Sequence, residues 1–224
     1  MLFRLWRVSD LAALHREEAL VAMTRPPLSI VVAPVQRGTG LAGCLEALAG
    51  QQDVGPVEIL VPVDHSVDGL EDLRSLHPKV TFFEVPDPDN DALSGDLGRI
   101  HLAIDRRRSA GLAAATGDVI ALTEEFARPD PDWCAQILEA HREAHEVIGG
   151  AIENANPAVV NWALYFSDAG RYQNPLPGGP AHYVSDMNVS YKRDALHRVG
   201  EVWREVYHEA GLHDALREAG GTFG

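Results

Sequence analysis

Four apolar runs rich in β-branched residues, each separated from the next by a segment of helical character, constrain the fold most strongly. The runs are 28–33, 57–61, 80–85 and 118–123. The first is almost continuously apolar, which is typical of a strand buried on both faces of a sheet. Strands that alternate with helices favour a parallel sheet with helices on both sides. The sequence therefore predicts an α/β fold.

The intervening segments define the domain organisation. Ser9–Asp10 can cap a helix that ends at Thr24–Pro27, so residues 1–27 are predicted to form an N-terminal helical extension. Residues 28–224 are predicted to form a single domain of ordinary size. A short strand is predicted at 187–191. The spacing of apolar residues predicts further helices at 40–51, 68–76, 106–115, 132–145, 157–169, 193–199 and 203–219.

Composition excludes some functions. The 224 residues include 19 basic and 33 acidic side chains, a formal net charge of −14. This charge disfavours the phosphate contacts that drive nucleic-acid binding, although a nucleotide can still bind in a locally basic or metal-bearing pocket. There is no apolar run of about 20 residues that would span a membrane, and no signal peptide, so a cytoplasmic protein is expected. Cys44 and Cys134 are predicted to be buried free thiols.

Residues 1–8 form a short patch of apolar and aromatic side chains around Arg4 and Arg7. Such a patch can lie on a membrane surface. It can equally pack on the domain or on a second chain. A membrane surface, contacted peripherally, and a second copy of the chain in a homo-oligomer therefore both stay open as partners.

Adjacent carboxylates end the fourth apolar run. Glu124 and Glu125 follow Val119–Thr123 directly and precede Phe126. In open α/β sheets ligands bind at the carboxyl ends of the strands. Neighbouring carboxylates repel each other unless a cation or a ligand compensates them. The sequence therefore predicts a ligand site at this edge of the sheet.

Six segments in order resemble the motifs of family-2 glycosyltransferases of the GT-A fold. The segments are Leu28–Gln51, Glu58–Gly69, Arg108–Asp118, Glu124–Phe126, Asn188–Leu196 and Tyr207–Glu209. The resemblance covers roughly residues 28 to 221 and implies a Rossmann-like, mostly parallel sheet flanked by helices. The implied activity is inverting transfer of a sugar from a nucleotide-diphosphate sugar to an acceptor hydroxyl. The acceptor is unknown, and a UDP-sugar is the donor most expected.

The same resemblance implies residues that contact the donor. Pro34 and Val35 lie in the turn after the first strand, and Glu124 lies after the fourth. Asp64 follows the second strand, where its carboxylate can accept the imide N–H of uracil or can simply cap the next helix. Arg108 can neutralise the diphosphate, or it can be a solvated member of a basic run.

Glu209 is the candidate general base. Inverting transfer needs a carboxylate that accepts the proton of the attacking hydroxyl. Glu209 falls where the family carries its acid, although a first-turn Glu also suits a helix dipole. His208 stands beside it, either as a second titrating group or as an exposed side chain.

The metal position departs from the family pattern. Phe126 stands where the family usually has the Asp that binds Mg²⁺ or Mn²⁺. Thr123–Phe126 is similar to a branch that reads TEDH here, so Phe126 is the sharper departure. Three interpretations are open: Glu124 or Glu125 holds the cation, with Glu125 as the candidate ligand, basic groups replace it, or the site is inactive.

Three functions follow from this pattern. The first is an inverting glycosyltransferase. The second is a non-catalytic GT-A-like binding or partner protein with a degenerate metal site, suggested by Val63 and Phe126. The third is a nucleotidyltransferase, for which Gln36–Gly40 is the candidate phosphate loop.

Overall fold

The computed structural model describes residues 25–35, 37–86, 97–156 and 158–224. The predicted N-terminal helix, the patch at 1–8 and most of the predicted loop after residue 86 lie outside this part of the chain. The described strands are β1 (Leu28–Ala33), β2 (Val57–Val63), β3 (Val80–Glu84), β4 (Val119–Glu124), β5 (Val147–Gly149) and β6 (Asn188–Lys192). The described helices are α2 (Leu41–Ala49), α3 (Leu70–Leu76), α4 (Leu97–Ala114), α5 (Trp133–Ala140), α6 (Val159–Asp168), η1 (Gly170–Tyr172), α7 (Arg193–Arg198), α8 (Gly200–Trp203) and α9 (Glu209–Glu218).

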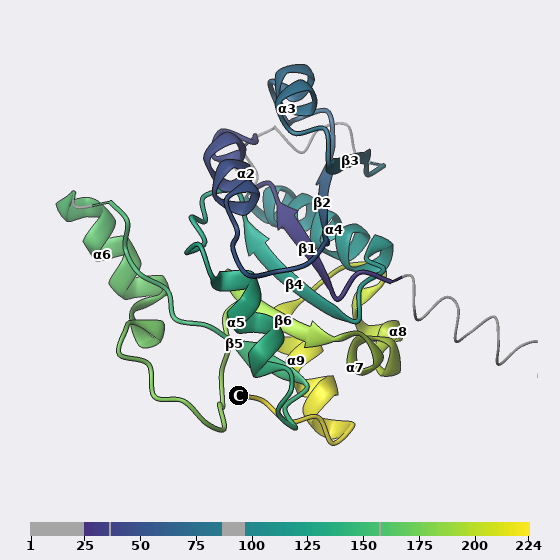
Figure 1. The fold of residues 1–224 in the computed structure, drawn as a ribbon, viewed down its shortest axis with the longest axis vertical. Helices are drawn as coiled ribbons and strands as arrows, with labels where there is room; N and C mark the ends of the chain where they lie inside the picture. Colours follow the sequence, from purple (N-terminus) through teal and green to yellow (C-terminus); the bar gives the residue numbers. More distant parts are fainter. Residues whose placement is uncertain (1–24, 36, 87–96, 157) are drawn as a thin grey trace, which may run out of the picture.

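One sheet organises the molecule (Figure 1), with the strand order β3-β2-β1-β4-β6-β5. β1 runs parallel to β2 and β4, and β2 runs parallel to β3. β6 is antiparallel to both of its neighbours, β4 and β5. The predicted α/β class and mostly parallel sheet are confirmed.

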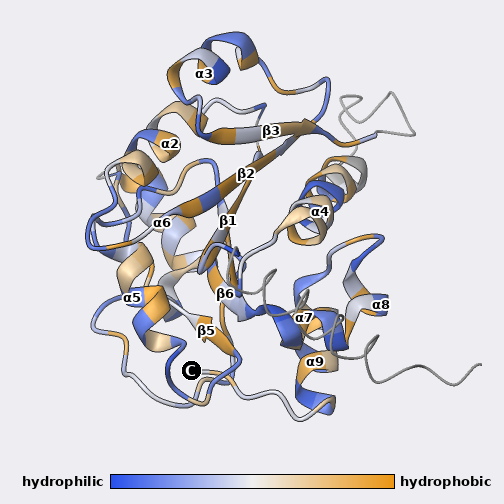
Figure 2. Ribbon diagram, turned by 45° about the vertical axis from the view of Figure 1, so that its right-hand side comes forward, coloured by the Kyte–Doolittle hydropathy of each residue, from blue (hydrophilic) through white to orange (hydrophobic). Residues whose placement is uncertain are grey.

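Each face of the sheet carries its own hydrophobic core. Ile30 and Val32 of β1 pack into a cluster with side chains of α2, α3 and α5. Val31 and Ala33 pack on the other face with side chains of α4, α7, α8 and α9. Successive side chains of a strand point to opposite faces, so a strand covered on both sides must be apolar throughout. Hydrophobic colouring accordingly concentrates on the central strands (Figure 2).

The C-terminal helices differ from the sequence prediction. A single helix over 203–219 is wrong, because α8 ends at Trp203 and α9 begins at Glu209. The backbone at His208 is extended, and its Nδ1 accepts a hydrogen bond from the amide of Gly211 at 3.2 Å. This side chain caps α9 in the way that Ser or Asp usually does. The break makes Glu209 the first residue of α9.

Two further boundaries were not predicted. β5 has only three residues, too few to show a pattern, and is fixed by its pairing with β6. α4 begins at Leu97 rather than at Arg106 and is the longest described helix.

No helix in the described part of the chain is both long and apolar enough to cross a membrane.

Gly111 sets how closely α4 approaches the sheet. A Cβ atom built at this position would overlap the Cγ1 atom of Val31 in β1. Val31 is fully buried in the core and has no room to move aside. The glycine therefore allows the backbone of α4 to lie against β1, which brings the side chains of α4 to the edge of the sheet.

We predict that Gly111→Ala destabilises the protein by about 1–3 kcal/mol, because a methyl group forced into a packed core costs this much. In an isolated helix the change from glycine to alanine would stabilise the helix. A decrease in the free energy of unfolding therefore indicates the steric conflict with Val31. Gly211→Ala in α9 is the matched control, since the nearest atom to its Cβ would lie 3.5 Å away. Urea denaturation measures both variants. Equal stability of the two would contradict the close approach.

Candidate functional site

A cavity of about 430 Å³ lies at the carboxyl ends of β1 and β4, between α4 and the start of α9. This volume is in the range of small-molecule sites. Its charged lining residues are Asp105, Arg108, Glu124, Asp186 and Glu209. The fold thus brings together four of the predicted residues, namely Val35, Arg108, Glu124 and Glu209. The other predicted residues, Pro34, Asp64 and Glu125, are not among those that line it.

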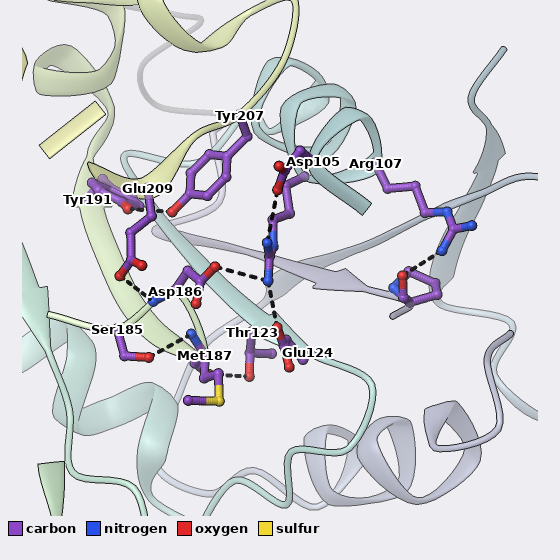
Figure 3. A network of polar contacts seen from close by, with 12 residues as sticks. Asp105, Arg107, Thr123, Glu124, Ser185, Asp186, Met187, Tyr191, Tyr207 and Glu209 are labelled. Carbon is purple, nitrogen blue, oxygen red and sulfur yellow. Dashed lines mark hydrogen bonds and ion pairs between the residues drawn. The ribbon is translucent and has the colours of Figure 1, made fainter. Parts of the chain in front are cut away.

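Arg108 lies at the centre of this cluster, between Asp105, Glu124 and Asp186, which are labelled in Figure 3. Its Nη2 atom is 2.5 Å from Oε1 of Glu124 and 2.9 Å from Oδ2 of Asp186. Its Nη1 atom is 3.0 Å from Oδ1 of Asp105, and the guanidinium lies 5.6 Å from the ring centre of Tyr207. Burial lowers the pKa of Arg108, but the neighbouring carboxylates raise it by more, so the pKa is above its ordinary value. Arg108 is therefore a fixed positive charge in a partly buried anionic cluster.

The alternation of β4 explains why Glu124 and not Glu125 meets Arg108. Ile120 and Leu122 face the core shared with α4, and Glu124 continues on the same side. Glu125 falls on the opposite side and is fully buried, with its backbone amide 3.3 Å from the carbonyl oxygen of Ala33. The carboxylate of Glu124 therefore lines the cavity, whereas that of the next residue, Glu125, is buried on the other side of the strand.

Glu209 has the environment of a carboxylic acid that titrates near neutral pH. Burial, and then the charge of Asp186, raise the pKa of Glu209 to about 7, although hydrogen bonding and nearby arginines act against this. The backbone amide of Asp186 donates a hydrogen bond to Oε1 of Glu209 at 3.1 Å. Asp186 therefore contacts both the candidate base, through its amide, and Arg108, through its carboxylate.

Asp64 is engaged away from this cavity. Its Oδ2 accepts a hydrogen bond from Nε of Arg107 at 2.8 Å. Its Oδ1 accepts from the amide and the hydroxyl of Ser66, at 2.9 and 2.6 Å. Arg107 also donates to the carbonyl oxygen of Pro34 at 2.6 Å. These contacts take up most of the acceptor capacity of the carboxylate. A contact of Asp64 with a base stays a prediction.

Sequence reasoning missed Arg107, Asp105 and Asp186. Asp186 precedes β6, whose antiparallel pairing sets Asn188 opposite Thr123 and so brings Asp186 beside Glu124. The sequence predicts the strand at 187–191. It does not predict that this strand pairs with β4 or that the two run antiparallel. Asp105 carried no signal, because the helix was expected to begin one residue later.

The described residues do not fit a divalent cation. In this part of the chain no group of three or more His, Cys, Asp or Glu side chains is arranged to hold a metal ion. The position between Glu124 and Asp186 is held by Nη2 of Arg108. The side chain of Phe126, which is 46% exposed, offers no ligand atom. The predicted role of Glu125 as ligand of Mg²⁺ or Mn²⁺ does not fit its position, because its side chain is buried outside the cavity lining.

No model of a known protein family matches the chain. The chain is similar to the putative glycosyltransferase EpsH of Bacillus subtilis (strain 168), with 27% identity over 150 residues. The match covers 66% of this chain and 37% of that protein. This similarity supports a relation to glycosyltransferases and leaves the family-2 assignment as a resemblance.

Solved structures define the fold. The mannosyltransferase PcManGT from Pyrobaculum calidifontis, in complex with GDP-Man and Mn²⁺, has a TM-score of 0.59 and 16% identity, over 94% of this chain and 61% of that one. Residues 1–349 of TarS from S. aureus, in complex with UDP, have a TM-score of 0.56 and 13% identity, over 85% of this chain and 54% of that one. The protein has the GT-A glycosyltransferase fold. It spans less than two thirds of the length of each of these relatives.

We predict that Glu209→Gln stabilises the protein at about pH 8 and has a smaller effect near pH 4. The folded protein holds the proton of Glu209 more tightly than the unfolded chain does. The stability that this proton contributes is complete below the ordinary value of 4.5 and is lost as pH rises through about 7. Glutamine removes this loss. Melting temperatures of both proteins across the pH range measure the difference, and a difference independent of pH would contradict the raised pKa.

Proposed function

We propose that the protein is an inverting glycosyltransferase that moves a sugar from a nucleotide-diphosphate sugar to an acceptor hydroxyl. The observation that carries the proposal is that Glu209 and Arg108 line the same cavity at the carboxyl ends of the strands. The GT-A fold and the similarity to EpsH support this class of reaction.

Glu209 is proposed as the general base. The acceptor oxygen attacks the anomeric carbon, its proton passes to the carboxylate of Glu209, and the bond from the anomeric carbon to the diphosphate breaks. A base is most effective when its pKa lies near the working pH. The pKa of about 7 suits this role, since burial and Asp186 raise it towards neutrality.

Arg108 is proposed to bind the diphosphate. Negative charge develops on this leaving group, and a buried guanidinium stabilises such charge more strongly than an exposed one. Val35 and Glu124, which also line the cavity, are proposed to contact the donor. Pro34 and Asp64, joined through Arg107, are proposed to support the nucleotide side of the site. A UDP-sugar stays the expected donor, and no step is assigned to a divalent cation.

A non-catalytic GT-A-like binding protein is the second candidate. The exposed Phe126 favours it, because the family resemblance places a metal ligand at this position. No observation favours a nucleotidyltransferase, since Nε of Arg37, the basic residue of the candidate loop, donates to Asp68 at 3.0 Å. A cytoplasmic location, a homo-oligomer and peripheral membrane contact stay predictions.

Donor binding tests the proposal. Thermal unfolding is measured with UDP-, GDP- and dTDP-sugars, each with EDTA and with Mg²⁺ or Mn²⁺. A ligand that binds the folded state raises the melting temperature by mass action. At least one donor is expected to do so. If none does in any condition, the protein is not a transferase of this kind.

We predict that Glu209→Gln lowers transfer or donor hydrolysis by about 100- to 10,000-fold, the usual contribution of a general base. The same variant is expected to keep its affinity for the donor. Glu205→Gln, an exposed glutamate outside the cavity lining, is the matched control and is expected to keep its activity. Release of free sugar and nucleotide is measured for both variants. Donor binding with no turnover in the wild type, across a panel of acceptors, would favour the non-catalytic candidate.

A further inference from the structure

We propose that Arg108 is the resident cation of this site and that the donor diphosphate binds without a divalent metal ion. The proposal rests on the proposed function, because it concerns how the same cavity holds a nucleotide-diphosphate sugar. It also assigns a reason to the unusual residue at position 126.

The first support is geometric. Glu124 and Asp186 approach one atom, Nη2 of Arg108, at 2.5 and 2.9 Å. Two carboxylates that converge on one point need a positive charge there. The guanidinium supplies this charge from within the chain, where a bound metal ion would otherwise be required.

The second support comes from the residues that follow Glu124. Glu125 points to the other face of β4 and is fully buried. The side chain of Phe126 is apolar and has no ligand atom. A divalent ion at this edge would therefore lack the ligands that an acidic motif normally supplies. A protein that carries its own cation has no need of them.

The third support is an unused donor. Arg108 is 9% exposed, and its Nε has no hydrogen-bond partner among the described residues. Most buried polar atoms are paired, so an unpaired donor on a buried guanidinium indicates a ligand that completes it. A diphosphate oxygen has the charge and the acceptor capacity that this atom requires, once the side chain turns its buried Nε towards the cavity.

The net charge of the cluster opposes an anion unless one of its carboxyl groups takes up a proton. One guanidinium faces three carboxylates, and a diphosphate adds further negative charge. Burial raises the pKa of Glu124 and of Asp105, although Arg108 acts against it. Either carboxyl group therefore takes up a proton more readily as an anion approaches. The charged or titratable residues around these two groups are His101, Arg108, Glu125, Asp186, His208 and Glu209.

The test compares donor affinity with and without metal. UDP-glucose, UDP-N-acetylglucosamine and GDP-mannose are titrated into the full chain by calorimetry, in EDTA and in Mn²⁺. We expect at least one donor to bind in EDTA with an affinity equal to that in Mn²⁺. Binding only in Mn²⁺ would overturn the proposal and leave the transferase function standing. Binding in neither condition would overturn both.

Variants separate charge from shape. Arg108→Met keeps the length of the side chain without its charge and is expected to weaken donor binding in EDTA by about ten- to hundredfold, as for hydrogen bonds to a charged group. Arg108→Lys restores a point charge and is expected to recover part of the affinity. Arg198→Met, which removes a surface ion pair with Glu146, is the matched control and is expected to bind as the wild type does. Unchanged affinity in Arg108→Met would overturn the proposal.

Glu124→Gln provides a test that survives if Arg108→Met fails to fold. Removing one of the carboxylates that hold Nη2 leaves the guanidinium in place to bind the diphosphate with or without metal. Because Glu124 is also proposed to contact the donor, the readout is the ratio of donor affinity in EDTA to donor affinity in Mn²⁺. We expect this ratio to equal that of the wild type. If Glu124 were instead a metal ligand, the variant would lose affinity only in Mn²⁺, and that change in the ratio would overturn the proposal.

Discussion

The site depends on the ion pairs of one guanidinium. Arg108 extends from α4, Glu124 from the end of β4, and Asp186 from the segment before β6, and Nη2 of Arg108 joins the latter two. A buried ion pair is costly unless each charge has good partners, and removing one partner leaves the others uncompensated. Arg108 therefore ties the consecutive elements α4 and β4 to the segment before β6, which lies much further along the chain. Asp186 extends the network to Glu209 through its amide.

Neighbouring arginines of α4 serve different strands. Residues that follow each other in a helix point about 100° apart. Arg107 reaches Asp64 after β2, and Arg108 reaches Glu124 at the end of β4. α4 thus stabilises two points of the same sheet edge with adjacent side chains. The close packing of Gly111 on β1 makes this reach possible, because it brings the helix backbone to the strands.

The sequence predicts the sheet well because β1 to β4 are read from local patterns. A strand buried on both faces must be apolar, and this is visible without knowledge of its neighbours. Arg108, Glu124 and Glu209 were also predicted, and all three line one cavity. Their chemical roles stay predictions. The sequence therefore predicted which residues lie at the carboxyl edge of the sheet, but not which of them contact each other.

Long-range pairing explains most of what was missed. Asp186 comes beside Glu124 only because β6 runs antiparallel to β4, and no local pattern encodes this direction. The break before α9 depends on a histidine cap at His208, where sequence rules look for Ser, Thr, Asp or Asn. The ion pair of Arg107 with Asp64 spans 43 positions along the chain. In the sequence alone, the three arginines at 106–108 are equivalent and all could be solvated. Only the fold shows that Arg107 and Arg108 contact different strands.

The alternation of β4 has a consequence for how this protein can change in evolution. Side chains of a strand repeat every second residue, so inserting or deleting one residue in β4 would exchange Glu124 and Glu125. The carboxylate facing Arg108 would move into the core behind the strand, although the composition of the segment would be the same. A substitution in β4 changes one side chain, whereas a shift in length moves every side chain beyond it to the opposite face. The spacing of this strand is therefore as much a part of the site as the identity of its residues.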